Sequence, residues 1–176
     1  MQDLTSGPRL LELLLLMTPA YVANMAPPFL RFWHGPNPPI SRRWLGDHKT
    51  VGGFLVGTLA GVLVAWLISL LTLWKLPHAN ELPFALHWFW FGSSMGFAAL
   101  LGDSIKSFFK RRLGIQSGSR WIPFDQLDFV AAALLVMSAW TKISWGEAAA
   151  ILALSLIADL LVNQVSYRLG IKREPW

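Results

Sequence analysis

Long apolar segments alternate with shorter polar ones along most of the chain. A helix that crosses a bilayer needs about 20 mostly apolar residues, and five segments approach that length. They cover residues 10–30, 51–74, 84–102, 127–145 and 147–167. The pattern therefore predicts an all-α integral membrane protein with five transmembrane helices. We interpret residues 1–176 as a single transmembrane domain with two longer polar loops, 31–50 and 103–126.

Glycines recur at four-residue intervals in two of the predicted helices. Gly53, Gly57 and Gly61 lie on one face of the second, and Gly92 and Gly96 lie on one face of the third. Small residues let helix backbones approach closely in lipid, where apolar side chains gain little from leaving their surroundings. We expect these glycine faces to serve helix packing.

The composition supports the same class of protein. Apolar residues make up 54% of the chain and charged residues 14%, whereas soluble domains average about 25% charged residues. Ten Trp residues suit the bilayer interfaces, where such side chains gather. The chain has no Cys, which excludes disulfides, thiolate metal sites and cysteine nucleophiles.

The distribution of lysine and arginine predicts the orientation in the membrane. Twelve of the 15 lie in residues 31–50, in residues 103–126 or after residue 167. Cytoplasmic segments carry an excess of these residues, so we expect the N-terminus outside and both polar loops and the C-terminus in the cytoplasm. The protein is then a multi-pass protein of the cell membrane with its active surface facing the cytoplasm. This explains the cations without any nucleic-acid partner.

The segment "GDSIKSFFKRRLG", residues 102–114, places acidic and basic residues at the edge of the third apolar segment. If the helix continues past the membrane, Asp103, Lys106 and Lys110 share one face, because residues three, four and seven apart stack along a helix. A cytoplasmic anchor would need the cations but no acid. We therefore favour a functional role for this face over simple anchoring.

A second acidic pair lies in "WIPFDQLDF", residues 121–129, where the fourth apolar segment begins. Asp125 and Asp128 could cap a helix N-terminus, where carboxylates are favourable, but capping explains one acid better than two. If the third and fourth helices are neighbours, both residues approach Asp103. Carboxylates bind Mg²⁺ through one or two oxygens and leave other positions to water and substrate phosphates. We favour a shared magnesium and phosphate site over capping.

Polar residues also occur inside the fifth apolar segment, where a membrane-spanning helix rarely has them. Asp159 lies nine residues before Arg168, which places it roughly 13 Å below the cytoplasmic edge. A charge at the membrane centre costs about 2.5–3.5 kcal/mol on insertion scales, so a partner or a polar cavity is expected. Asn163 and Ser166 follow on the same helical face, and Asn24 of the first segment can join them. Hydrogen bonding between helices and a substrate cavity explain this stripe equally well.

The polar segments described above, together with three others, are similar to the archaeal CDP-archaeol synthases. The matching stretches are "YVANMAPPF" (21–29), "GDHKTVGGFLVG" (46–57), "GDSIKSFFKRRLG" (102–114), "WIPFDQLDF" (121–129) and "NQVSYRLGIKREPW" (163–176). Two of them also resemble the signature of the related CDP-diacylglycerol synthases, which has Gly-Asp, Ser, Lys-Arg and an Asp-Arg-x-Asp-like end. The positions that match this signature are Gly102, Asp103, Ser107, Lys110, Arg111, Asp125 and Asp128.

The resemblance implies an enzyme, its substrates and its cofactor. The family consists of CTP-dependent cytidylyltransferases, which use Mg²⁺ to transfer CMP from CTP to an isoprenoid diether glycerol phosphate and release pyrophosphate. The resemblance implies that Asp103, Asp125, Asp128 and Lys106 are catalytic and that the three carboxylates hold the metal. The expected CTP and phosphate contacts are Asp47, Lys49, Ser107, Lys110 and Arg111. Asn24, Asp159 and Asn163 are expected to border the lipid head group.

Other functional classes find less support in the sequence. It contains no Walker loop, no Rossmann glycine pattern and no nucleophile elbow, and its four His residues lack metal-ligand spacing. CDP-alcohol phosphotransferases and polyprenyl transferases need more extensive Asp-rich motifs. A small membrane transporter or scaffold without catalytic activity is the alternative, since it would explain the five spans and Asp159.

Overall fold

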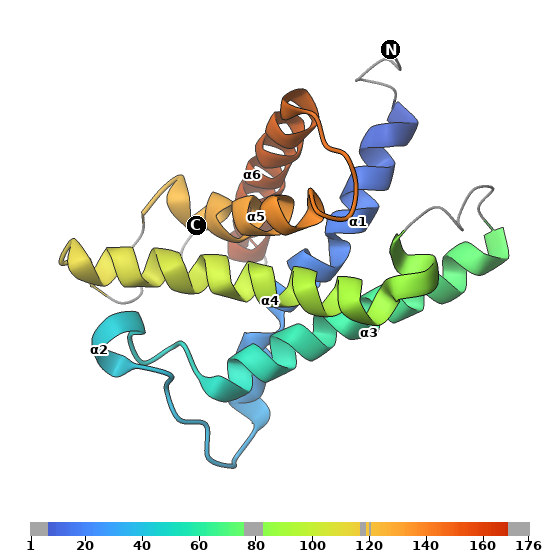
Figure 1. Cartoon of the computed structure of the whole chain (residues 1–176). Coiled ribbons are helices and arrows are strands. Elements are labelled where there is room, and N and C mark those ends of the chain that lie inside the picture. Colours follow the sequence, from blue (N-terminus) through green and yellow to red (C-terminus); the bar gives the residue numbers. More distant parts are fainter. Residues whose placement is uncertain (1–6, 76–82, 117–118, 120, 169–176) are drawn as a thin grey trace.

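The computed structural model describes residues 7–75, 83–116, 119 and 121–168. These residues form α1 (Gly7–Met25), the 3₁₀ helix η1 (Pro27–Phe32), α2 (Arg42–Leu45), α3 (Val51–Lys75), α4 (Pro83–Arg112), α5 (Phe124–Met137) and α6 (Trp145–Arg168). Pairing of extended backbone is limited, in this part of the chain, to a single bridge between Pro39 and Thr50. The predicted all-α class is therefore confirmed for the described residues (Figure 1).

Three stretches of the described residues are long and apolar enough to cross a membrane. They are Arg9–Leu30, Val51–Leu71 and Trp145–Val162, and they fall on the first, second and fifth predicted spans. The other two predicted spans fall on α4 and α5. Because α5 has only 14 residues, it extends over about 21 Å, less than the roughly 30 Å of a bilayer core. The structure supports several membrane-crossing helices, and their number stays a prediction.

Two predicted boundaries differ from the observed helix ends. Residues 103–112, predicted as part of a polar loop, form the last turns of α4. Neither glycine nor proline interrupts this run, and the helix stops just before Gly114, whose φ of 72° favours glycine. The fourth span, predicted over residues 127–145, corresponds to α5, which begins before this range and ends well short of residue 145.

Glycines bring α3 and α4 into close antiparallel contact. A Cβ atom at Gly61 would lie 2.9 Å from the backbone oxygen of Gly92, and one at Gly92 would lie 2.7 Å from the Cα atom of Val62. Side chains do not approach backbone atoms this closely, so both positions exclude any larger residue. The predicted packing role of the glycine faces is confirmed at these positions.

Replacing Gly92 with Val is expected to destabilise the helix bundle. The new side chain would have to displace backbone atoms of α3, and such overpacking costs about 1–3 kcal/mol. We expect a lower melting temperature in detergent, and the change in Trp fluorescence on heating measures it. Gly146→Ala is the matched control, because a Cβ atom there meets nothing within 4 Å. Equal melting temperatures for the two variants would contradict the close α3–α4 contact.

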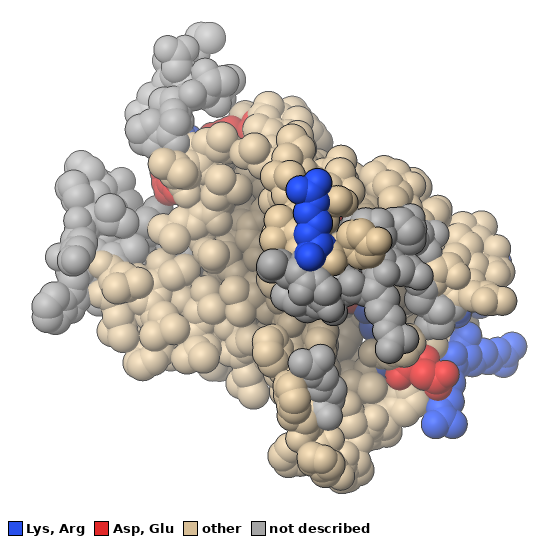
Figure 2. Space-filling view, turned by 180° about the vertical axis from the view of Figure 1, so that it is seen from behind, with Lys and Arg blue, Asp and Glu red and all other residues tan. Residues whose placement is uncertain are grey.

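The buried core is formed where α1, α4, α5 and α6 meet, and α3 adds Ala65 and Ile68 to it. The largest fully buried side chains include Leu13, Leu16 and Met17 of α1, Phe91 and Met95 of α4, Val130 and Met137 of α5, and Ile151 of α6. On the outside, α3 and α6 expose apolar side chains such as Leu59 and Leu161. Figure 2 shows one face of the molecule, on which most described side chains are uncharged and the largest group of charged ones gathers at one end. Such a surface suits contact with lipid chains.

Arg9 ties the start of α1 to the connection between α5 and α6. Its Nη1 atom donates to Glu12 at 2.6 Å, its Nε atom to Glu147 at 3.2 Å and its Nη2 atom to the backbone oxygen of Lys142 at 2.9 Å. The carboxylate of Glu147 also accepts the backbone N–H of Ser144 at 2.8 Å. These contacts hold together one end of the helix bundle.

Candidate active site

Three aspartates and three lysines among the residues singled out from the sequence meet at one end of the helix bundle. In Figure 1, α5 runs back along α4, and α2 lies beside the C-terminal half of α4. Gly102 allows the close approach of α5, because a Cβ atom there would lie 2.6 Å from the backbone oxygen of Asp128. The glycine before Asp103 therefore has a structural reason, which is to bring the acids of two neighbouring helices together.

The ammonium group of Lys106 is the point on which three carboxylates converge. Its Nζ atom lies 3.0 Å from Oδ1 of Asp103, 3.2 Å from Oδ1 of Asp125 and 2.8 Å from Oδ2 of Asp128. Helical spacing places Lys106 one turn after Asp103, and α5 supplies the other two acids. The three acids lie close together, as expected if the third and fourth predicted spans are neighbours, and the group that stands among them is a lysine.

Two further lysines flank this group. Lys49, in the segment before α3, donates a hydrogen bond to Oδ2 of Asp103. The Nζ atom of Lys110 lies 3.0 Å and 3.2 Å from the two carboxylate oxygens of Asp125, and the backbone N–H of Trp121 donates to the same carboxylate at 2.6 Å. Three lysines thus alternate with three aspartates across α4, α5 and the segment before α3. We call these six residues the lysine–aspartate cluster.

Mutual pairing keeps the central groups of the cluster charged. Burial alone would raise the pKa of Asp103, but the charges of Lys49 and Lys106 outweigh it, and the pKa lies below its ordinary value. Burial alone would lower the pKa of Lys106, but the charges of Asp103 and Asp128 outweigh it, and the pKa is raised. An anion that reaches the centre of the cluster at neutral pH therefore meets a protonated Lys106.

Asp128 is the member of the cluster whose carboxylate oxygens lack hydrogen-bond partners among the described residues. Its side chain is only 7% exposed, and its Oδ1 atom has no hydrogen-bond partner among the described residues. The Oδ2 atom lies at ion-pair distance from Lys106, but the geometry of this contact is not that of a hydrogen bond. A buried carboxylate oxygen without a partner is unfavourable. A cation that entered next to Asp128 would remove this cost.

The donor set fits a hard divalent cation, although the arrangement is not a ready-made metal site. Three carboxylates offer the oxygen ligands that Mg²⁺ prefers, and Asp128 has an oxygen to spare. Within the described ranges, no three His, Asp or Glu side chains are already arranged to hold a metal ion. The physical reason is that Lys106 stands among the acids. A metal could take this position only if Lys106 moved away.

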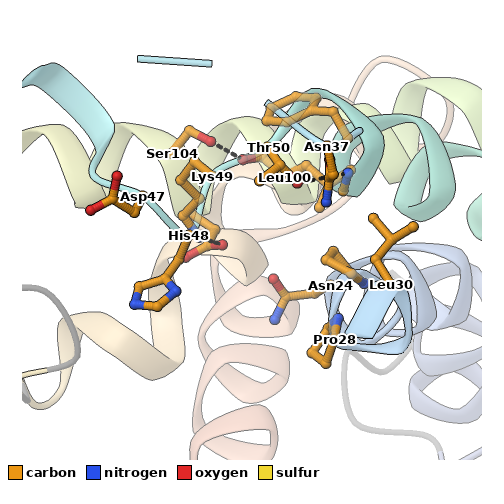
Figure 3. A pocket seen from close by; sticks show the side chains of 14 residues that line it. Asn24, Pro28, Leu30, Asn37, Asp47, His48, Lys49, Thr50, Leu100 and Ser104 are labelled. Atoms are coloured by element: carbon orange, nitrogen blue, oxygen red, sulfur yellow. Dashed lines mark hydrogen bonds and ion pairs between the residues drawn. The ribbon is translucent and has the colours of Figure 1, made fainter. Parts of the chain in front are cut away.

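A cavity of about 550 Å³ opens beside the cluster. Its lining includes Asn24, Leu30, Asn37, Asp47, His48, Lys49, Thr50, Asp103 and Ser104. In Figure 3, Asn24 of α1 and Leu30 of η1 lie across the cavity from Asp47 and His48. The lining contains both polar and apolar side chains, which suits a ligand with a charged part and an uncharged part.

Two predicted phosphate contacts have other partners in the structure. The hydroxyl of Ser107 donates to the backbone oxygen of Asp103 at 2.8 Å, within α4. Asp47 lines the cavity but forms its ion pair with Arg42 at 3.2 Å. Both side chains of this pair are more than three-quarters exposed. The carboxylate that accepts a hydrogen bond from Lys49 is that of Asp103.

Arg111 lies apart from the lysines although it follows Lys110 directly. Successive residues are rotated by about 100° around an α-helix, so the two side chains leave α4 in different directions. Arg111 lines a separate, smaller cavity together with Arg43, Trp44 and Arg112. The structure therefore does not bring Arg111 to the lysine–aspartate cluster.

Of the three residues expected at a lipid head group, one lines the large cavity. Asn24 lines the large cavity. Asp159 lies on α6 and is not among the described residues that line it. The side chains of Asn163 and Ser166 fall outside the described part of the chain, so the predicted polar stripe on α6 is not tested.

Three polar residues that line the cavity were not identified from the sequence. Ser104 follows Asp103 directly in the stretch "GDSIKSFFKRRLG" but was given no role. Thr50 lies in the matching stretch "GDHKTVGGFLVG" but was given no role. Asn37 gave no signal, because its place depends on how the first polar loop folds back. Asn37 accepts the backbone N–H of Gly52 at 3.1 Å, which fixes this loop at the start of α3.

Comparison with known proteins places the chain in a family. Residues 8–176 match a family model described as CarS-like, CDP-archaeol synthase. Relatives named CDP-archaeol synthase include those of Methanospirillum hungatei JF-1, with 38% identity over 77% of this chain and 82% of the relative, and of Thermofilum pendens, with 38% identity over 93% and 79%. The Aeropyrum pernix relative of the same name is 36% identical over 95% of this chain and 92% of its own.

A solved structure supports the same relationship. It is described as "Structural insight into an intramembrane enzyme for archaeal membrane lipids biosynthesis" and superposes with a TM-score of 0.72 at 31% identity. The match covers 88% of this chain and 94% of that chain. Because the family model and these relatives extend over nearly the whole sequence, the chain belongs to the CarS-like CDP-archaeol synthase family.

Proposed function

We propose that this protein transfers CMP from CTP to an isoprenoid diether glycerol phosphate and thereby forms CDP-archaeol and pyrophosphate. It is then a CTP-dependent cytidylyltransferase of archaeal phospholipid biosynthesis. The observation that carries this proposal is the lysine–aspartate cluster beside a cavity of about 550 Å³, at one end of a bundle of membrane helices. Membership of the CDP-archaeol synthase family supports it.

The proposed reaction is a nucleotidyl transfer. An oxygen of the lipid phosphate attacks the α-phosphorus of CTP, and the bond from this phosphorus to the oxygen that bridges to the β-phosphate breaks. Pyrophosphate leaves with that bridging oxygen and the bonding electron pair. Such transfers depend mostly on positioning and on stabilisation of phosphate charge. The protein therefore needs fixed cations more than it needs a nucleophile of its own.

The three lysines of the cluster are suited to this task. They come from two separate segments of the chain. Lys49 lines the cavity, and Lys106 and Lys110 belong to the cluster next to it. Each is already oriented by a carboxylate, so little reorganisation is required when a triphosphate arrives. Asp103 orients Lys49 and Lys106, while Asp125 orients Lys110. We propose Lys106 as a catalytic residue because it stands at the centre of this group.

Magnesium is the proposed cofactor, with Asp103, Asp125 and Asp128 as its ligands. The unpartnered oxygen of Asp128 supports this choice. When bound, the metal supplies positive charge that neutralises the phosphate oxygens. Lys106 would then leave its place among the carboxylates, and its ammonium group would become free to contact a phosphate.

The lipid substrate is proposed to enter the cavity from the bilayer. Asn24 lines the cavity on the α1 side and is the proposed contact for the lipid head group. Asp159 and Asn163 on α6 are further proposed contacts. Nearby apolar walls, such as Leu30 and Phe54, suit the first carbons of the isoprenoid chains.

The proposed topology has five transmembrane spans, with the N-terminus outside and the active site facing the cytoplasm. The lysine–aspartate cluster lies at the same end of the bundle as α2 and the last turn of α4, which carry Arg42, Arg43, Arg111 and Arg112. This clustering of cations supports a cytoplasmic location. CTP is a cytoplasmic nucleotide, so a cytoplasmic cavity is also the one that it can reach.

The proposal is tested by mixing the purified protein with CTP, Mg²⁺ and the isoprenoid diether glycerol phosphate. We expect release of pyrophosphate and formation of a CDP-lipid, which thin-layer chromatography detects with labelled CTP. A transporter or scaffold would produce neither. Absence of both products in a protein that still binds CTP would reject the enzymatic function.

Replacing Lys110 with Ala is expected to weaken CTP binding. Lys110 is buried and paired with Asp125, so the change removes one phosphate contact and leaves a carboxylate that repels the triphosphate. Loss of a charged hydrogen bond of about 1.5–3 kcal/mol raises the Kd by about 10–100-fold. Titration calorimetry measures this change. Lys142→Ala, at the opposite end of the bundle, is the control, and equal CTP affinity in both variants would place Lys110 outside the nucleotide site.

A further inference from the structure

Three arginine side chains line a cavity that the proposed reaction does not use. It has a volume of about 170 Å³, and its lining is Arg43 and Trp44 of α2 with Arg111 and Arg112 of the last turn of α4. We call it the arginine pocket. Two elements that are distant in sequence therefore contribute cations to a single small space.

The charges of the arginine pocket are not balanced by the protein itself. Among the described residues, no ion pair joins Arg43, Arg111 or Arg112 to a carboxylate, whereas neighbouring Arg42 is paired with Asp47. The Nε atom of Arg111 is buried and has no hydrogen-bond partner in this part of the chain. Like charges gathered in a small space repel each other, and a buried donor without an acceptor is unfavourable. Both costs are relieved by an anion with several oxygens.

An apolar groove lies next to the arginine pocket. Its volume is about 360 Å³, and it is lined by Ile40, Leu45, Phe54, Leu101, Ser104, Ile105 and Phe108. A stacked aromatic pair connects the two spaces. Trp44 belongs to the pocket and Phe108 to the groove, and their rings stack at 5.4 Å between centroids. The guanidinium of Arg112 lies 4.9 Å from the centroid of Trp44.

We propose that the arginine pocket and the groove together bind an acidic membrane phospholipid. The phosphate of the lipid head group lies among the three guanidinium groups, and one of its hydrocarbon chains lies in the apolar groove. Guanidinium groups suit phosphate because they donate several hydrogen bonds in a fixed plane. A free phosphate would use the pocket but would leave the groove empty, so the adjacent groove favours a lipid.

Lipid bound here would stabilise the loop that carries Lys49 to the active site. The pocket joins α2 to α4, and the chain continues from α2 through Asp47 to Lys49, which contacts Asp103. The backbone N–H of Ile40 also donates to the backbone oxygen of Lys49 at 2.8 Å, so the ends of this loop are tied together. Neutralising the arginines therefore stabilises the position from which Lys49 reaches the cavity. This consequence rests on the proposed function, whereas lipid binding does not.

The test measures retention of lipid by the full-length protein in a neutral detergent, using native mass spectrometry. The probes are diphytanyl phosphatidylglycerol, which is acidic, and diphytanyl phosphatidylcholine, which has no net charge. We expect the wild-type protein to retain the acidic lipid preferentially. Arg43→Gln and Arg112→Gln should each reduce this preference about fivefold, since each basic residue near an acidic membrane surface contributes about 1 kcal/mol. Arg42→Gln is the matched control and should retain the wild-type preference.

Three outcomes would overturn the proposal. One is equal retention of the two lipids by the wild-type protein. Another is an unchanged preference in Arg43→Gln, whose side chain is exposed and whose replacement should not disturb folding. The third concerns the source of the phosphate. If titration with inorganic phosphate or pyrophosphate shows binding that Arg43→Gln abolishes, while lipid retention is unaffected, the pocket takes a soluble anion.

A second variant tests the groove separately from the pocket. Ile105 lines the groove and is 48% exposed, so Ile105→Asp adds a negative charge without opening the core. We expect it to lose acidic-lipid retention while the arginines are intact. Normal retention would remove the groove from the lipid site. These measurements need no CTP or turnover, so their failure can be distinguished from failure of the proposed enzymatic function.

Discussion

Asp103→Asn is expected to reduce CMP transfer into lipid by about 10³-fold, a loss comparable to removing a main charge-stabilising group from an active site. Asp103 orients both Lys49 and Lys106 through its carboxylate. The amide keeps the shape of the side chain but loses the negative charge, so both lysines lose their fixed positions and the proposed metal loses a ligand. The rate is measured with radiolabelled CTP at saturating concentrations of both substrates.

Asp128→Asn is the companion variant on α5. Its Oδ1 atom has no hydrogen-bond partner among the described residues, so the substitution breaks no hydrogen bond at that atom. We therefore expect a folded protein with a similar loss of transfer. Glu12→Gln, at the far end of the bundle where Glu12 accepts from Arg9, controls for removing an acid as such. Near-normal turnover in either aspartate variant would exclude that carboxylate from the site.

These variants also separate catalysis from structure. If the cluster only anchored helices, both substitutions would lower the melting temperature and would affect activity in proportion to the unfolded fraction. A catalytic cluster predicts a loss of rate far larger than the unfolded fraction explains, even where breaking the ion pairs with Lys49 or Lys106 lowers the melting temperature. Measuring both quantities on the same preparation decides between the two roles.

The local part of the site could be predicted from the sequence because helical geometry fixes it. Residues three and seven apart share a face, and Asp103, Lys106 and Lys110 do so in α4. The same geometry also separates Arg111 from Lys110, since neighbours point in different directions. We grouped these two residues by motif, and the periodicity of the helix would have placed Arg111 correctly.

The tertiary part of the site could not be predicted in the same way. The position of Lys106 among three carboxylates depends on how closely α5 approaches α4, which the glycine at position 102 permits. The cavity walls depend on how residues 33–41 fold back onto α3, where Asn37 contacts Gly52. Neither arrangement leaves a periodic signal, because both come from contacts between segments that are distant in sequence.

Hydrophobicity predicted the helices better than it predicted their ends. Within the described ranges, an apolar run marks each α-helix of 14 residues or more, because such a helix needs an apolar surface for lipid or for the core. The last turns of α4 carry charged residues, so hydropathy ended the span at residue 102 while the helix continues to Arg112. Charge marks the edge of an apolar segment, but glycine marks the end of this helix.

Lys106→Met is expected to have the largest effect on stability of the substitutions considered. The side chain of Lys106 is 12% exposed and stands among three carboxylates. Removing one partner from a buried ion pair costs about 3–5 kcal/mol, because the remaining charge is left uncompensated. The melting temperature should therefore fall well below that of the wild-type protein, and CMP transfer should fall by about 10²–10³-fold. Lys106→Arg retains the charge and should keep most of the stability.

Addition of Mg²⁺ makes this variant informative about the metal. If the three carboxylates are metal ligands, a divalent cation can take the place of the missing ammonium group, and binding to the folded state raises its stability. Millimolar Mg²⁺ should then restore part of the melting temperature of Lys106→Met and have a smaller effect on the wild-type protein, in which Lys106 competes for the same place. Lys142→Met, at the opposite end, should show no such recovery. If Mg²⁺ stabilised Lys106→Met no more than the wild-type protein, the carboxylates around Lys106 would not be the metal site, whatever the effect on catalysis.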